Sequence, residues 1–221
     1  MRSPFSLLHF LLFFFLLVFL LTFIQLQLIT LSFERLGLSP TATLLMLLGS
    51  LLGSGINIPL FSIRAEPPPE VIETPFGLLR PPPLPFTGRT VIAVNVGGCL
   101  IPLLFSLYLV SRLDLPLPPL LLGIALVALL SYIFSRPIPG MGIGMPMLLP
   151  PLIAATVAVV LGGEEYRAPF AYICGTLGVL IGADVLHLRD IPRLGAPIAS
   201  IGGAGTFDGI FMTGVLAVLL A

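Results

Sequence analysis

Two aspartates lie inside apolar stretches of this 221-residue sequence. Asp184 lies in GVLIGADVLHL, and Asp208 lies in IGGAGTFDGIF, within an apolar segment that runs to the last residue. A carboxylate at the centre of a membrane helix costs about 2.5–3.5 kcal/mol on insertion scales, so an aspartate in such a place usually has a function and a partner. When two carboxyl groups share one cavity, repulsion between their charges makes it unfavourable for both to ionise, so the pair should hold one proton near neutral pH. Asp184 and Asp208 are therefore the predicted catalytic residues.

A carboxyl pair that shares one proton fits two classes of function. In an aspartyl hydrolase, one carboxylate takes a proton from water while its protonated partner donates to the scissile carbonyl oxygen. The alternative is a proton- or cation-coupled transporter or channel, in which the same aspartates load and release the ion. A scaffold without chemistry is the third interpretation. No cofactor is expected for any of them.

The segment SIGGAGT, just before Asp208, is expected to be unwound. On straight helices, Asp184 would lie about 6 Å and Asp208 about 15 Å from the inner ends of their spans, so they would miss each other by about 9 Å. Glycines favour non-helical backbone, which a membrane protein tolerates only where protein or water covers it. We therefore expect a cavity here. The supporting residues from this segment are Gly202, Gly203, Gly205 and Thr206.

His187 follows Asp184 by three residues and so shares its helical face. A metal site made of His187 and the two aspartates is therefore an alternative, since imidazole and carboxylate are common metal ligands. The more ordinary interpretation is a histidine that caps carbonyl groups near a helix end. No metal is assigned.

Two further segments combine glycines with polar or irregular sequence. Asn57 and Asn95 lie in GSGINIPL and NVGGCLIPL, which share glycines, an asparagine and a final Pro-Leu. The two amides either bond between packed helices or line a polar path. The segment PGMGIGMP at 139–146, with Gly140 and Gly142, is either a re-entrant loop that offers backbone groups to a substrate or a simple connector.

The composition is that of an integral membrane protein, with 57% hydrophobic and 9% charged residues. We expect an all-α membrane bundle that forms a single domain over residues 1–221, with about seven spans and a possible re-entrant loop. A span needs about 20 apolar residues. The candidate spans are 4–33, 41–61, 90–110, 115–134, 148–161, 169–188 and 198–221. The net charge of zero gives no reason to expect a nucleic-acid partner, whereas membrane lipid is an expected partner. The oligomeric state stays open.

Arginines predict the orientation of the chain. With the N-terminus inside, seven arginines fall on the cytoplasmic side and three on the other, which the positive-inside rule favours. The cytoplasmic set is Arg2, Arg64, Arg80, Arg89, Arg136, Arg189 and Arg193, and the other set is Arg35, Arg112 and Arg167. The C-terminus is then outside. The proline-rich connection 62–88 is expected to be a stiff surface loop, either a spacer or a contact for a substrate or partner.

The sequence places Asp184 at the inner end of one helix, then a short connection, then a glycine motif before Asp208 in the next helix. This pattern resembles the intramembrane aspartyl proteases of the presenilin, signal-peptide-peptidase and prepilin-peptidase type. This resemblance implies that Asp184 and Asp208 are catalytic, that Gly203 and Gly205 are the motif glycines, and that the substrate is a transmembrane peptide. Over the whole chain, INIPL, RPIPGMGIG, GADVLHL and GGAGTFDGIF resemble a family of prokaryotic multi-pass membrane proteins known as a domain of unknown function. That resemblance implies a location in the prokaryotic cytoplasmic membrane.

Overall fold

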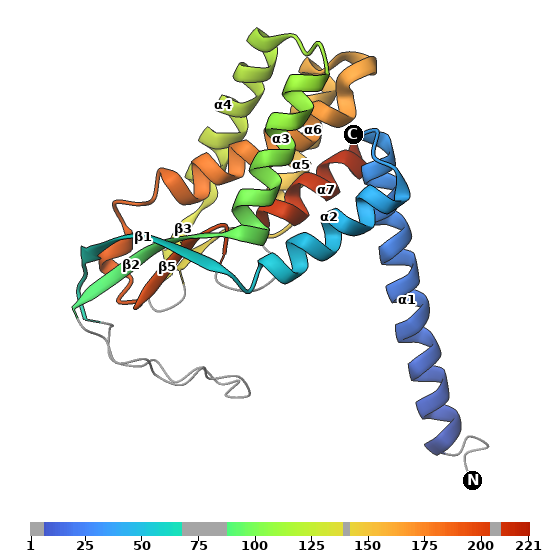
Figure 1. The fold of residues 1–221 in the computed structure, drawn as a ribbon, viewed down its shortest axis with the longest axis horizontal. Coiled ribbons are helices and arrows are strands. Elements are labelled where there is room, and N and C mark those ends of the chain that lie inside the picture. Colours follow the sequence, from blue (N-terminus) through green and yellow to red (C-terminus); the bar gives the residue numbers. More distant parts are fainter. Residues whose placement is uncertain (1–6, 68–87, 139–141, 204–208) are drawn as a thin grey trace.

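The computed structural model describes residues 7–67, 88–138, 142–203 and 209–221 (Figure 1). Most of this chain is helical. The elements follow in the order α1 (Leu7–Arg35), α2 (Pro40–Gly53), β1 (Asn57–Arg64), β2 (Arg89–Asn95), the π-helical η1 (Val96–Leu100), α3 (Ile101–Arg112), α4 (Leu117–Phe134), β3 (Arg136–Ile138), β4 (Gly142–Gly144), α5 (Leu149–Leu161), α6 (Gly163–Val179), the π-helical η2 (Leu180–Val185), the 3-10 turn η3 (Ile191–Arg193), β5 (Ile198–Ile201) and α7 (Gly209–Leu220).

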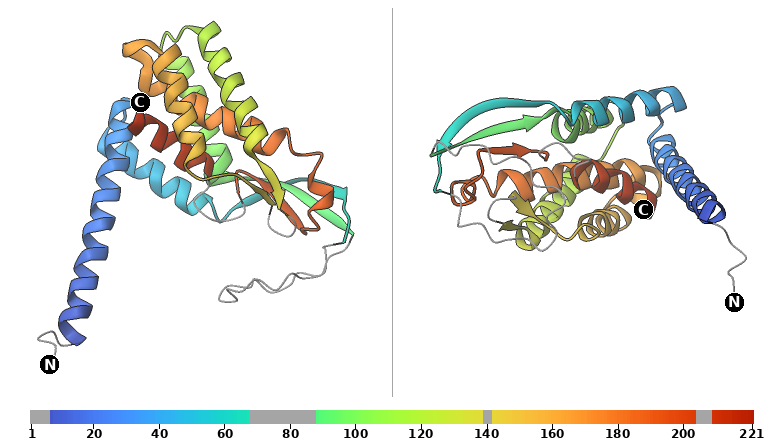
Figure 2. Two further views of the ribbon diagram at one scale, coloured as in Figure 1. Left: turned by 180° about the vertical axis from the view of Figure 1, so that it is seen from behind. Right: turned by 90° about the horizontal axis from the view of Figure 1, so that it is seen from below.

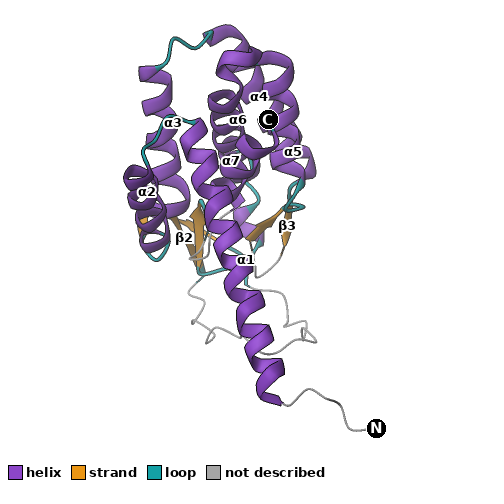
Figure 3. Ribbon diagram, turned by 90° about the vertical axis from the view of Figure 1, so that its right-hand side faces the viewer, coloured by secondary structure: helices purple, strands orange, loops and turns teal. Residues whose placement is uncertain are grey.

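Helix α6 lies at the centre of a bundle and packs against α3, α4, α5 and α7 (Figure 2). Its middle is fully buried from Phe170 to Cys174. Aromatic rings join the helices around it: the ring of Tyr172 packs edge-on against that of Phe105 in α3, with centroids 5.1 Å apart. Phe33, near the end of α1, contacts Phe105, Tyr172 and Phe211. This aromatic cluster holds α1 against the bundle, while the rest of α1 extends away from it and past the level of the sheet (Figure 3).

Within the described residues, three helices are long and apolar enough to cross a membrane, namely Phe14–Arg35 within α1, Leu117–Phe134 (α4) and Gly163–Val185 (α6 with η2). The expected spans 115–134, 148–161 and 169–188 coincide with α4, α5 and the α6–η2 helix. The shorter apolar helices are Pro40–Gly53, Val96–Arg112, Leu149–Leu161 and Ile210–Leu220. A membrane protein built mainly of helices, as the sequence predicts, is therefore supported.

A three-stranded sheet corrects the expectation of an all-helical bundle. Its order is β1-β2-β5, with β1 antiparallel and β5 parallel to β2. The strands occupy parts of the expected spans 41–61, 90–110 and 198–221. Their sequences, such as RTVIAVN in β2, are rich in β-branched residues, which favour extended backbone. The sheet lies at one end of the bundle, which we call the sheet end (Figure 1).

Two connections also differ from expectation. β1 continues to Arg64, so the first residues of the expected loop 62–88 are strand; positions 68–87 lie outside the described residues. The segment after α4, expected to be either a re-entrant loop or a simple connector, forms the short antiparallel pair of β3 and β4. Gly140 is outside the described residues.

Candidate functional site

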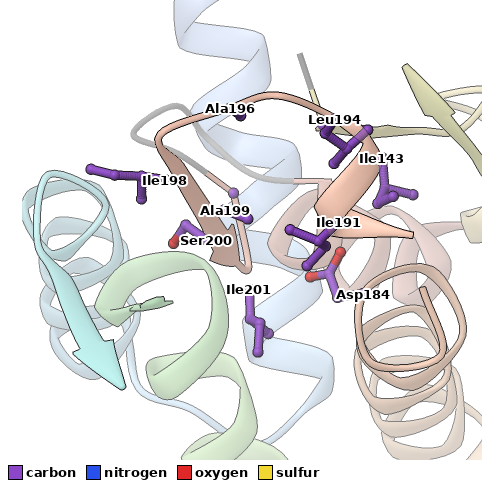
Figure 4. A pocket seen from close by; sticks show the side chains of 11 residues that line it. Ile143, Asp184, Ile191, Leu194, Ala196, Ile198, Ala199, Ser200 and Ile201 are labelled. Atoms are coloured by element: carbon purple, nitrogen blue, oxygen red, sulfur yellow. The ribbon is translucent and has the colours of Figure 1, made fainter. Parts of the chain in front are cut away.

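A cavity of about 140 Å³ lies at the sheet end. Its wall comes from β4, the end of η2, the segment from η3 to Ala196, and β5 with Gly203. Isoleucine and leucine side chains, including Ile143 and Leu194, make most of this wall, and Asp184 and Ser200 supply polar side chains. Figure 4 shows the Asp184 carboxylate beside Ile191. The cavity therefore presents both apolar and polar surface, with the Asp184 carboxylate among its polar groups.

The Asp184 carboxylate is held by the segment that leads toward α7. Its Oδ2 accepts a hydrogen bond from the backbone N–H of Gly202 at 2.8 Å. Gly202 and Gly203 have φ values of +83° and +89°, which L side chains rarely adopt. The non-helical backbone expected at these glycines is therefore present, and it brings a backbone donor to a half-buried carboxylate.

Gly202 also contacts the other π-helical segment. A Cβ at this position would lie 2.5 Å from Cys99 Cβ and 2.6 Å from Cys99 N, so only glycine fits against η1. Gly202 thus lies between η1, which it packs against, and η2, whose Asp184 it binds. Single π-helical turns occur often at functional sites, because they aim a side chain that a regular helix would place elsewhere.

Asn57 and Asn95 form a polar network in the sheet. They lie directly opposite each other in the β1–β2 pair, and Asn95 Nδ2 donates to Asn57 Oδ1 at 3.0 Å. The hydroxyl of Ser200, a wall residue of the cavity, also donates to Asn57 Oδ1. Asn95 is buried, donates to the Ser54 carbonyl and accepts from Gly98 N, which caps η1. These amides therefore fix strands and the start of η1, a role that the sequence interpretation of helix packing did not include.

His187 is only 4% exposed. Its Nδ1 lies 3.1 Å from the Gly182 carbonyl oxygen, and its ring packs on Tyr132 with centroids 4.7 Å apart. This is the carbonyl-capping arrangement that the sequence allowed. Within the described part of the chain, no group of three His, Cys, Asp or Glu side chains could hold a metal ion.

The structure brings several predicted site residues together. Asp184, Gly142 and Gly203 line one cavity, and Gly202 binds Asp184. Asn57 and Asn95 connect to the same cavity through Ser200, which the sequence analysis did not single out. Its signal was a hydroxyl in the otherwise apolar strand IASI. The predicted residues Asp208, Gly205, Thr206 and Gly140 lie outside the described residues.

Comparisons with known proteins identify the family. No curated protein and no solved structure matched the chain. A family model described as "Protein of unknown function (DUF1614)" matches residues 51–220, from the end of α2 to the end of α7. The match includes the sheet, the cavity and both predicted catalytic aspartates. The chain therefore belongs to the DUF1614 family.

Proposed function

We propose that this protein is an intramembrane aspartyl hydrolase that cleaves transmembrane peptides with Asp184 and Asp208. The observation that carries the proposal is the hydrogen bond from Gly202 N to Asp184 Oδ2. It ties the end of the α6–η2 helix to the glycine segment that precedes Asp208. In the sequence, Asp208, the proposed second carboxyl group, immediately precedes Gly209, the first residue of α7.

The described cavity supports the proposal, because it is large enough for an apolar side chain next to Asp184. A volume of about 140 Å³ exceeds that of one water molecule and is close to that of cavities that hold a benzene ring. Its isoleucine and leucine side chains suit apolar residues of a membrane peptide. Asp184 is half-buried at the wall, where a shielded carboxyl group interacts more strongly with a neighbouring charge than it would in water.

In the proposed reaction, the two carboxyl groups begin with one shared proton. The ionised carboxylate takes a proton from water as the water oxygen bonds to the scissile carbonyl carbon, and the protonated partner gives its proton to the carbonyl oxygen. The tetrahedral diol then collapses. The C–N bond breaks as the protonated carboxyl group gives its proton to the leaving nitrogen, while the ionised carboxylate takes the proton of one diol hydroxyl. The pair then again holds one proton.

We further propose seven membrane passes, with the N-terminus inside a prokaryotic cytoplasmic membrane. The arginines support this orientation. Those described at the sheet end are Arg64, Arg89, Arg136, Arg189 and Arg193, whereas Arg35, Arg112 and Arg167 lie at the other ends of their helices. A sheet end on the cytoplasmic side would follow the positive-inside rule. It would also agree with the likeness to presenilin-type proteases, in which the first catalytic helix runs inward.

The test uses the full-length protein in proteoliposomes with a set of single-span peptides, and mass spectrometry detects the products. Asp184→Asn and Asp208→Asn should each lower the cleavage rate by about 100- to 10,000-fold, the usual contribution of general acid–base groups. Asp190→Asn is the matched control, because Asp190 lies at the same end but outside the cavity wall. It should cleave like the wild type.

The same vesicles distinguish the rival function. A transporter or channel that uses these aspartates would move protons or cations without forming peptide products, and a trapped pH dye would report the flux. Cleavage that survives in either aspartate variant would refute the hydrolase. Flux that disappears in both variants, with no products in the wild type, would establish the rival.

A further inference from the structure

The strand pair β1–β2 ends in two arginines that face each other. Arg64 lies directly opposite Arg89 in the antiparallel register, and both side chains are exposed. Like charges in such a pair destabilise a sheet. Among the residues that the structure describes, no carboxylate lies within ion-pair distance of either guanidinium; Arg89 Nη1 approaches the hydroxyl of Ser62 at 3.5 Å. An anion from outside the chain would relieve this repulsion.

β1 presents apolar side chains to its surroundings. Ile58, Leu60 and Phe61 are 44%, 54% and 54% exposed. β1 is also an edge strand, so part of its backbone lacks a strand partner. Hydrocarbon does not tolerate an open sheet edge, and in water an apolar edge strand invites aggregation. The border between headgroups and acyl chains suits both features.

Two details of β1 disfavour a partner strand on this edge. Pro59 has no backbone N–H to donate, and the register shifts between Pro59 and Phe61. Prolines and bulges are common means of preventing strand addition at sheet edges. A lipid surface therefore suits β1 better than a second copy of the chain does.

The charge of the sheet end complements an anionic membrane. Arg136, Arg189 and Arg193 are exposed at this end, as Arg64 and Arg89 are. Guanidinium groups bind phosphate oxygens through two parallel N–H donors and are more weakly hydrated than ammonium groups. A phosphate between two guanidiniums would meet donors from both.

We propose that the Arg64–Arg89 pair binds the phosphate of an anionic phospholipid, with Ile58, Leu60 and Phe61 at the level of the first acyl carbons. This lipid site stands apart from the hydrolase proposal, because neither arginine lines the cavity. The site would fix the sheet, and therefore β5, at a constant depth relative to the membrane surface.

The experiment titrates the full-length protein, purified in a neutral detergent, with short-chain phosphatidylglycerol or phosphatidylcholine and counts bound lipids by native mass spectrometry. The wild type should prefer phosphatidylglycerol. Arg64→Gln with Arg89→Gln should weaken that binding about 30-fold, on the basis of the usual contribution of an arginine at an anionic surface, and should leave phosphatidylcholine binding unchanged. Arg64→Lys with Arg89→Lys should recover part of the loss.

Arg112→Gln is the matched control. Arg112 is exposed at the far end of α3, where its guanidinium lies 6.0 Å from the Tyr108 ring centroid, and its loss should not change phosphatidylglycerol binding. Equal binding of the two lipids, unchanged binding in the Arg64–Arg89 double variant, or an equal loss in Arg112→Gln would overturn the proposal. Displacement of the lipid by an equal concentration of inorganic phosphate would also overturn it, since that result indicates a small-anion site.

A second measurement does not depend on the arginine variants. A spin label on Phe61→Cys in vesicles that contain phosphatidylglycerol should lie at the border of headgroups and acyl chains. The native Cys99 and Cys174 are buried and should not be labelled in the folded protein. A label in bulk water or at the bilayer centre would contradict the proposed depth.

Discussion

Gly202 N lies 2.8 Å from Asp184 Oδ2 and donates a hydrogen bond to it, although the two residues belong to different elements. The bond joins the end of the α6–η2 helix to the backbone just after β5. Gly202 also packs against Cys99 of η1. One glycine therefore connects the carboxylate, the last strand and the start of the η1–α3 helix.

Replacing Gly202 with alanine should destabilise the protein by about 2–4 kcal/mol. The cost has two sources: a φ of +83° that alanine adopts poorly, and a Cβ that would overlap Cys99. Denaturant titration in detergent, followed by circular dichroism, measures the change. Gly37→Ala is the control, because Gly37 has a φ of +82° with no atom within 4 Å of the added Cβ. It should cost about 1–2 kcal/mol, and equal costs at the two positions would contradict the packing argument.

Asp184→Asn should leave stability within about 0.5 kcal/mol of the wild type, because the amide oxygen still accepts the hydrogen bond from Gly202 N. Asp184→Leu removes the acceptor and should cost about 1–3 kcal/mol. Thermal unfolding can be followed by the reaction of a dye with the buried Cys99 and Cys174, which suits a chain without tryptophan. An Asp184→Asn protein as unstable as Asp184→Leu would show that Gly202 does not bind the asparagine.

Asn95→Leu should destabilise the protein by about 2–4 kcal/mol. Asn95 is 1% exposed, and the substitution leaves the Gly98 N–H and the Ser54 carbonyl without the side chain that binds them. Asn57→Ala is the comparison. Asn57 is exposed, so water can replace its bonds and the loss should be below about 1 kcal/mol. The same denaturant titration ranks the two variants. A larger loss of stability in Asn57→Ala than in Asn95→Leu would contradict this prediction.

Gly182→Ala should push η2 away from α4, because the added Cβ would overlap the Ala128 carbonyl oxygen. We expect a loss of about 1–3 kcal/mol. Gly49→Ala in α2 is the matched control, since its Cβ would meet its nearest neighbour, Ile101 Cδ1, at 3.6 Å. That variant should be neutral or more stable by up to about 1 kcal/mol, as alanine favours helix. A Gly182→Ala protein as stable as Gly49→Ala would show that the α4–η2 contact adapts.

The apolar runs 115–134 and 148–161 predicted α4 and α5 well, and the structure shows prolines where both helices begin. α4 starts at Leu117 with proline in its first turn, and α5 starts at Leu149 in the same way. Proline suits the first turn of a helix, since the N–H it lacks has no intrahelical partner there. The expected starts, 115 and 148, lie within two residues of the observed ones.

The strands were missed because they lie inside continuous apolar runs. β1 is exposed on almost all its residues, so it shows no alternation of apolar and polar side chains. The likeness of GSGINIPL to NVGGCLIPL was the one sequence feature that pointed to the strands. The glycines and asparagine of the first segment lie where α2 gives way to β1, and those of the second lie where β2 gives way to η1. In the structure, Asn57 and Asn95 face each other.

The contact between Asp184 and the glycine segment was predicted in part. The short connection between their spans made them neighbours, and the glycines predicted loose backbone. The hydrogen bond itself depends on the parallel pairing of β5 with β2, which places Ile198 beside Val91. Pairing between such distant residues leaves no local pattern in a single sequence.

The parallel pairing of β2 with β5 has a consequence for the order of synthesis. β5 joins a strand more than 100 residues upstream, and the described residues of the cavity wall all lie at or after Gly142. A ribosome delivers the N-terminal part first, so most apolar segments can insert before β5 has been translated. A nascent chain halted at residue 190 would therefore lack eight of the eleven described residues that line the cavity. The cavity can therefore form only after β5 has been translated.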